Sequence, residues 1–235
     1  MKAEEVTARL RKLGKDSYKR ILLKHGAREP VLGVSVADLK ALMKETGKDH
    51  ALALELFKTG IYDAMYLAGL MADSRAMTRK DLAAWVKGAN CQGLWEYTVA
   101  WVAAESPMGF EIGLEWIDAR NEGTASAGWA TLSGVVALRD DKDLDLKVLD
   151  ALLKRVEKTI HKEKNRVRYT MNGFVIALGS FVTPLTARAL EAAATIGPVT
   201  VDMEGTACIV PSAADYIQKV KARGALGRKK KTVKC

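Results

Sequence analysis

Residues 165–179 read NRVRYTMNGFVIALG, and this stretch joins a cationic, hydrogen-bonding segment directly to an apolar one. Its first part carries Arg166 and Arg168, whereas residues 173–179 are apolar. Upstream, residues 154–168 contain seven basic side chains against two acidic ones. The pattern predicts a helix whose apolar length lies in the core and whose cationic beginning is a candidate nucleic-acid surface.

Helical periodicity extends outward from this stretch over almost the whole chain, and no segment alternates as a strand does. The expected helices span residues 3–13, 16–25, 36–46, 49–58, 61–72, 79–88, 91–104, 107–119, 122–138, 145–162, 165–180, 184–196 and 212–222. Short helices with short links bury their apolar faces by stacking as antiparallel pairs. The sequence therefore predicts an all-α superhelix, a solenoid of HEAT-like repeats, and a globular helical bundle is the alternative because the internal repeat is weak.

Helix start and stop signals support these boundaries. Ser35 and Thr78 each begin a near capping box that ends in Asp, and Pro107 and Pro184 suit a first helical position. Glycines follow several apolar-periodic runs, where left-handed C-caps are expected, at Gly47, Gly60, Gly88 and Gly197.

The formal charge of +9 is concentrated at one end of the chain. Eight basic residues lie in residues 219–234, a segment without acidic side chains, which leaves +1 for everything before it. We expect one solenoid domain over residues 1–222 and a flexible basic tail over residues 223–235. Charge segregation of this kind favours a binding patch on one face.

Cysteine and histidine spacing argues against metal or redox chemistry. Cys91, Cys208 and Cys235 form no CxxC pair, and no two histidines have metal-ligand spacing. No glycine-rich phosphate loop follows a strand, so we expect no metal and no cofactor. The longest apolar run, residues 173–182, is too short to span a membrane, and the charged start is unlike a signal peptide. These features are typical of a soluble cytoplasmic protein.

Four segments together resemble a known family. Residues 165–173, NRVRYTMNG, and 197–217, GPVTVDMEGTACIVPSAADYI, look like the closing repeats of the DNA alkylation repair enzymes, the AlkD-like HEAT-repeat proteins. Residues 33–39, GVSVADL, and 47–60, GKDHALALELFKTG, are similar to the opening helices of that family, so the resemblance extends to about residue 220. It implies a curved stack of helix pairs whose concave cationic face holds duplex DNA. In the active glycosylases of the family, that face excises 3- and 7-alkylated purines.

The resemblance also implies an altered catalytic pattern. Active members carry Trp-x-x-x-Asp on a central helix, and that window falls on residues 92–96, where Glu96 supplies the carboxylate and Trp95 is the aromatic residue. The arginine of the family falls near Gly128 beside Trp129, and its second tryptophan falls near Gly173. The candidate catalytic residues are therefore Glu96, Trp95 and Trp129. Each of these residues also has a structural interpretation. The carboxylate of Glu96 can complement a helix dipole, and the two tryptophans can pack in the core.

The cationic beginning of the helix supplies the candidate DNA contacts. A phosphate near its N-terminus can satisfy free backbone N–H groups as well as arginine side chains. The candidate DNA-binding residues are Lys162, Lys164, Arg166, Arg168, Tyr169 and Asn172.

Three functions remain open at this point. The first is a monomeric DNA-repair protein that binds alkylated or distorted double-stranded DNA and cleaves glycosidic bonds through Glu96. The second is a non-catalytic DNA-structure-binding protein on the same scaffold, which the altered positions favour. The third is a protein-interaction solenoid whose basic strip meets an acidic partner.

Overall fold

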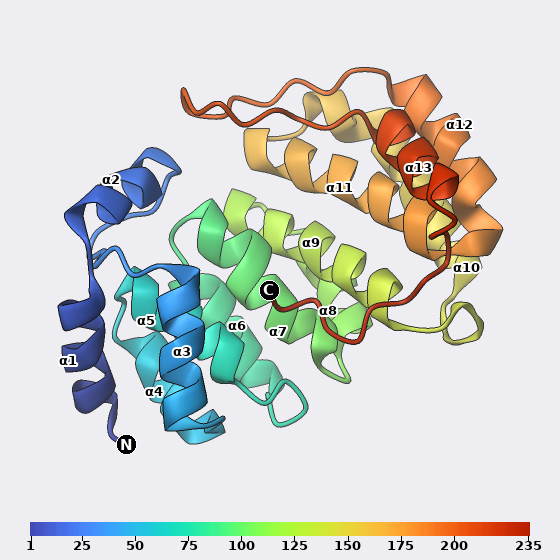
Figure 1. The fold of residues 1–235 in the computed structure, drawn as a ribbon. Helices are drawn as coiled ribbons and strands as arrows, with labels where there is room; N and C mark the ends of the chain where they lie inside the picture. The colour runs from blue at the N-terminus through green and yellow to red at the C-terminus, as the bar shows by residue number, and fades with distance from the viewer.

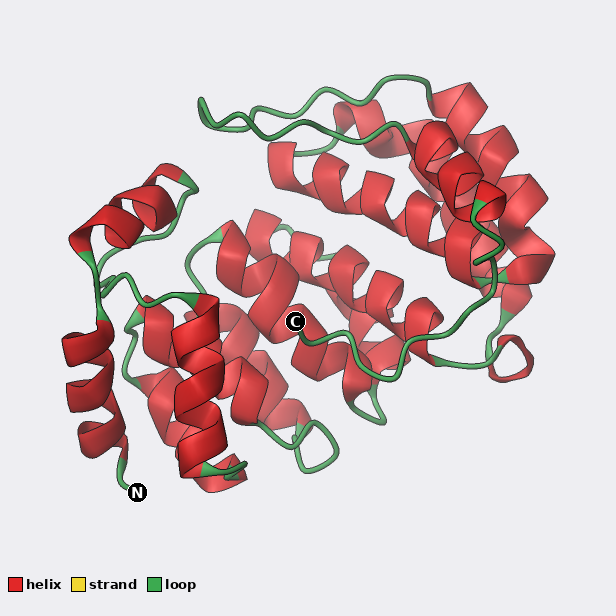
Figure 2. Ribbon diagram, in the orientation of Figure 1, coloured by secondary structure: helices red, strands yellow, loops and turns green.

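The computed structural model describes all 235 residues, and its regular elements are all helical (Figures 1 and 2). The α-helices are α1 (Ala3–Leu13), α2 (Asp16–Lys24), α3 (Val36–Thr46), α4 (His50–Lys58), α5 (Tyr62–Met71), α6 (Arg79–Gly88), α7 (Ala100–Glu105), α8 (Gly109–Trp116), α9 (Glu122–Leu138), α10 (Leu146–Thr159), α11 (Asn165–Phe181), α12 (Thr186–Ile196) and α13 (Ala213–Ala222). A π-helical segment, η1 (Leu94–Val99), precedes α7, and short 3-10 turns are η2 (Asp141–Asp143), η3 (Ile160–Lys162) and η4 (Thr183–Leu185). The predicted all-α class is confirmed.

The helices pack in two layers. The inner row consists of α5, η1 with α7, α9, α11 and α13, and each of these elements contacts the next. Outer helices cover this row from behind, with α4 on α5, α8 on α9 and α12 on α11. The apolar face of each helix is thus buried by its own partner and by the next repeat, as the short amphipathic helices require.

Local sequence signals set most helix ends. The hydroxyl of Ser35 accepts the backbone N–H of Asp38 at 3.1 Å, which is the predicted cap of α3. Gly47 follows that helix with φ of 76°, a positive value that glycine adopts readily and other residues rarely do. The prediction for Gly88 is wrong, because Gly88 is the last residue of α6 and the chain continues in an extended conformation at Ala89.

One expected helix is irregular. Residues 91–104 were expected to be one α-helix, whereas the structure has π turns over η1 before the chain becomes α-helical in α7. A π turn holds one extra residue, and such turns occur often at functional sites. Here it contains Glu96, which lies in the inner row.

The apolar core has two parts, and both include residues of α9. Ala127 of this helix belongs to the part of the core formed with α1 to α8, while Trp129 belongs to the part formed with α10 to α13. No single helix is both long and apolar enough to cross a membrane. The segments Asn165–Phe181 and Thr183–Ile196 satisfy length and composition only as a pair bent by 115°.

Two non-helical segments cross the ends of the inner row (Figures 1 and 2). Residues 197–212 run from α12 toward α2, where Sγ of Cys208 lies 3.9 Å from Nδ1 of His25. The C-terminal segment, residues 223–235, runs from α13 back to α5, where Sγ of Cys235 lies 3.1 Å from the Tyr66 hydroxyl. The expectation of a flexible tail is corrected, because this segment is hydrogen-bonded to the helices it crosses.

Candidate nucleic-acid interface

The inner row lines a groove with an apolar floor. One hollow of about 570 Å³ lies between η1, α7, α9, α11, α13 and the C-terminal segment. Its floor on α9 consists of small residues, Ala130, Ser133, Gly134 and Ala137. A second hollow of about 310 Å³ continues toward α2 and includes side chains of the 197–212 loop. The two hollows share Tyr97 and Tyr169, so the groove is continuous at these two side chains.

An aromatic strip follows this groove and consists of Tyr62, Tyr66, Tyr97, Trp101 and Tyr169. The rings of Tyr66 and Trp101 meet edge to face at 5.5 Å, and those of Tyr97 and Trp101 at 5.7 Å. Tyr97 is 43% exposed.

Only Tyr169 of this strip was predicted as a site residue, although the sequence holds a signal for the others. Tyr62 and Tyr66 are four residues apart, as are Tyr97 and Trp101, and this spacing places each pair on one face of a helix.

Glu96 and Arg166 form a buried ion pair beside the aromatic strip. Nε and Nη2 of Arg166 donate to the two carboxylate oxygens of Glu96 at 2.7 and 2.6 Å. The side chains are 3% exposed for Glu96 and 11% for Arg166. This is the bidentate geometry that best compensates the desolvation of two charges.

The remaining surface of the Arg166 guanidinium is also occupied. Its Nη1 lies 3.8 Å from Sδ of Met203, and its plane lies 4.3 Å from the ring centroid of Tyr169. The backbone N–H of Arg166 donates to Glu122 at 2.8 Å. The expectation that Arg166 is a free phosphate-binding cation is therefore corrected, since its donors already have partners.

The electrostatics of Glu96 differ from those of a catalytic carboxylate. Burial raises the pKa of Glu96, and the hydrogen bonds from Arg166 oppose that rise. A carboxylate that stabilises an oxocarbenium ion must present uncompensated negative charge to the sugar. The guanidinium neutralises that charge here. The prediction of Glu96 as a catalytic group is corrected to a structural role in joining η1 to α11.

The two candidate tryptophans do not face the groove. Trp129 is fully buried, packs edge to face on Phe174 at 5.1 Å and lies beneath the Arg155 guanidinium. Trp95 donates its indole N–H to the carbonyl of Ala89 at 2.8 Å and packs against Gly123. Both are corrected to packing residues.

The polar side chains at the start of α11 hold the 197–212 loop. Asn165 exchanges two hydrogen bonds with the backbone of Asp202, at 2.9 and 2.7 Å. Asn172 donates to the carbonyl of Pro211 at 2.9 Å and is buried. Asn172 is therefore corrected from a DNA contact to a loop anchor.

The other cations of the 154–168 stretch are partly engaged. Lys164 donates to the carbonyl of Arg120, and the half-buried Arg168 donates to Asn165 at 3.3 Å. Lys162 is exposed and has no ion-pair partner. The predicted cationic front is thus largely a set of structural contacts. No cluster of three or more histidine, cysteine or acidic side chains is arranged to hold a metal ion.

A two-layer stack of helix pairs whose inner row forms an aromatic-lined groove defines a HEAT-like α-solenoid. The family model described as "DNA alkylation repair enzyme" matches residues 6–207, and the chain belongs to this family.

The chain is also similar to individual proteins. Uncharacterised proteins from Listeria innocua and Listeria monocytogenes are each 28% identical over 225 residues, which covers 94% of this chain and 97% of theirs. A solved structure described as "a new family of proteins related to the HEAT-like repeat DNA glycosylases with affinity for branched DNA structures" superposes with a TM-score of 0.92. It is 35% identical, and the match covers 100% of both chains.

Proposed function

We propose that this protein binds branched or otherwise distorted double-stranded DNA in the groove of its inner row and does not excise bases through Glu96. The bidentate ion pair between Glu96 and Arg166 is the observation that argues against base excision through Glu96. Binding of branched DNA is supported by membership of the family. It is also supported by the solved structure whose sequence is 35% identical, because that protein is described as having affinity for branched DNA structures.

The aromatic strip suits DNA whose base stacking is interrupted. Aromatic side chains bind bases through their π-faces without reading sequence. Base pairs next to a branch point have a free face, whereas those inside a linear duplex are covered on both sides. The exposed ring of Tyr97 in the groove is placed to cover such a face. We therefore expect structure-dependent and sequence-independent binding.

The proposed binding is tested by comparing a four-way junction with a linear duplex of the same arm sequence. We expect tighter binding of the junction, with log K falling linearly as log salt rises between about 50 and about 200 mM, because phosphate contacts release counterions. Fluorescence anisotropy measures both affinities. Equal affinity for the two DNAs would contradict the preference for branched structure.

A pair of variants at one position tests the aromatic strip. Tyr97→Ala removes the exposed ring and should weaken junction binding by roughly tenfold, since stacking is worth about 1–3 kcal/mol per base. Tyr97→Phe keeps the ring and should retain junction affinity. If neither DNA is bound at moderate salt, an acidic protein partner becomes the better explanation of the scaffold.

A further inference from the structure

The C-terminal segment is attached to the inner row by hydrogen bonds. The N–H of Gly227 donates to Ser180 in α11 at 2.9 Å, and the N–H of Lys230 donates to Ala137 in α9 at 2.8 Å. The N–H of Val233 then donates to Glu105 in α7 at 3.1 Å. The segment thus crosses the carboxyl ends of three successive inner helices and is joined to each (Figure 1).

Two lysines of the segment are used as anchors. Lys229 donates to the carbonyl of Val136 at 2.9 Å and pairs with Asp141 at 2.8 Å. Lys234 donates to the carbonyl of Ala72 at 2.7 Å, next to the end of α5. Lysines are favoured at helix carboxyl ends because they complement free carbonyls and the helix dipole. Burial lowers the pKa of Lys234, and the nearby carboxylate of Glu105 opposes that shift.

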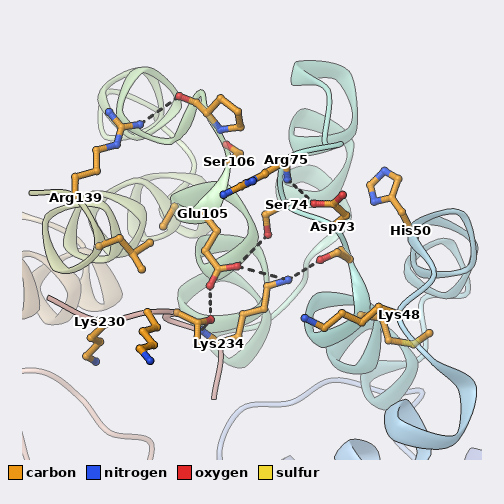
Figure 3. Close-up of a pocket in the computed structure, with 17 residues that line it drawn as sticks. Lys48, His50, Asp73, Ser74, Arg75, Glu105, Ser106, Arg139, Lys230 and Lys234 are labelled. Carbon is orange, nitrogen blue, oxygen red and sulfur yellow. Dashed lines mark hydrogen bonds and ion pairs between the residues drawn. The ribbon is translucent and has the colours of Figure 1, made fainter. Parts of the chain in front are cut away.

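The remaining lysines of the segment, Lys230 and Lys231, line a cationic hollow, and the Lys230 ammonium also lies 5.4 Å from the centroid of the Phe181 ring. A cavity of about 900 Å³ lies between the C-terminal segment and the ends of α5, α7 and α9. Its five cationic side chains that take part in no ion pair are Lys48, Arg75, Arg139, Lys230 and Lys231. Figure 3 labels Lys48, Arg75, Arg139 and Lys230 among the lining residues, together with Glu105.

The acidic side chains of the hollow are already engaged. The carboxylate of Glu105 accepts hydrogen bonds from Ser74, Thr232 and Val233 and lies 3.8 Å from the Lys234 ammonium. Asp73 accepts the backbone N–H of Arg75 at 3.0 Å. Arg139 donates to the carbonyl of Pro107 at 3.2 Å, but none of the five cations has an acidic partner. Their charge is therefore not neutralised inside the hollow, and a concave site with excess charge of one sign concentrates ions of the opposite sign.

We propose that this hollow binds the phosphate backbone of a second arm of branched DNA. It lies at the carboxyl ends of the inner helices, whereas Glu96 and Arg166 lie near the amino ends of η1 and α11. An inner helix such as α9 separates the two edges by about 1.5 Å per residue. The groove thus contacts one arm along the aromatic strip, and the hollow, which shares Lys230 of the C-terminal segment with the groove, contacts another arm at the carboxyl ends of the inner helices. This inference rests on the proposed function and names the surface that distinguishes a junction from a duplex.

The triple variant Lys48→Ala, Arg75→Ala, Lys231→Ala tests the hollow. These three side chains are exposed and anchor nothing, so folding should be unaffected. We expect junction affinity to fall by roughly tenfold or more and the log-log salt slope to fall by about 0.9 for each phosphate that is no longer bound. Affinity for a linear duplex should change much less.

The matched control is Lys80→Ala, Lys87→Ala, Lys147→Ala, which removes the same charge from α6 and α10. An equal loss of junction affinity in both triple variants would show a long-range charge effect and overturn the site. Unchanged or tighter junction binding by the hollow variant would overturn it as well.

A probe without DNA separates this inference from the proposed function. Inorganic tripolyphosphate should raise the thermal unfolding midpoint of the wild-type protein and of the control, but not of the hollow variant. One outcome is that the protein binds no DNA, but tripolyphosphate still raises the unfolding midpoint of the wild type and not of the hollow variant. In that case the proposed function is wrong and the hollow is still a polyanion site. If tripolyphosphate acts equally on all three proteins and junction binding is also unaffected, the hollow carries no site.

Discussion

At the scale of single residues, the partner of each charge decides its role. Both carboxylate oxygens of Glu96 accept hydrogen bonds from Arg166, and for this reason we propose that Glu96 does not act in glycosidic cleavage. Removing two charges from water is costly, and bidentate geometry recovers most of that cost only while both partners are present. The pair therefore joins η1 to α11.

Breaking this pair should destabilise the fold. Glu96→Gln leaves the buried guanidinium of Arg166 without a counter-charge, and we expect the free energy of unfolding to fall by about 3–5 kcal/mol. Urea denaturation measures the change. The matched control is Glu55→Gln, which breaks an exposed pair with Lys58 and should have little effect. Equally small effects for the two variants would contradict a structural role for the buried pair.

Thiol reactivity should separate the three cysteines. Cys91 is buried and burial raises the pKa of its thiol, whereas Cys208 and Cys235 are exposed. Because the thiolate is the reactive form, we expect iodoacetamide to modify Cys208 and Cys235 rapidly and Cys91 only after unfolding. Mass spectrometry of peptides over a time course gives the three rates. Rapid modification of Cys91 in the folded protein would show that the segment between α6 and η1 opens readily.

Site residues were harder to predict from sequence than helices. Arg166 and Glu96 are 70 residues apart, so no local pattern indicates that they pair. Arg166 was expected to hold phosphate because basic residues cluster around it in sequence, but in space that cluster meets carbonyls and carboxylates. Tyr97 and Trp101 could have been found from their spacing, since four residues place both rings on one helix face.

At the scale of elements, helix positions followed from periodicity and irregularities did not. Bounds such as 122–138 agree with α9, because an apolar stripe and its cap are local features. Pro184 lies at the beginning of a helical turn, as expected, but that turn is the 3-10 segment η4 and α12 begins only at Thr186. The π turns of η1 could not be predicted from the sequence either, because they depend on how that segment packs on α5 and α9.

Two glycines in the inner row should respond oppositely to alanine. At Gly123 in α9, a Cβ atom would overlap the ring of Trp95, and overpacking of this kind costs about 1–3 kcal/mol. At Gly173 in α11, no atom lies within 4 Å of the added Cβ, so alanine should stabilise the helix by about 0.5–1 kcal/mol. Thermal unfolding of Gly123→Ala and Gly173→Ala gives the two signs. A stabilising Gly123→Ala would mean that Trp95 is not held against α9.

At the scale of the whole molecule, two non-helical segments determine what the groove can contact. Residues 197–212 cross one edge, and residues 223–235 cross the other. The net charge of the chain indicated a basic tail, but no local pattern in that tail indicates that it is fastened to three helices. Loop anchoring depends on carbonyls at helix ends, which only the assembled fold brings together.

We propose that this groove holds DNA and does not release a base from it. One sample tests both parts, a four-way junction that contains 3-methyladenine and 7-methylguanine, in which bound DNA and released bases are quantified together. We expect a stable complex, and we expect no base release above the buffer control during a time much longer than the lifetime of the complex. Release of either base above buffer by the bound protein would contradict it.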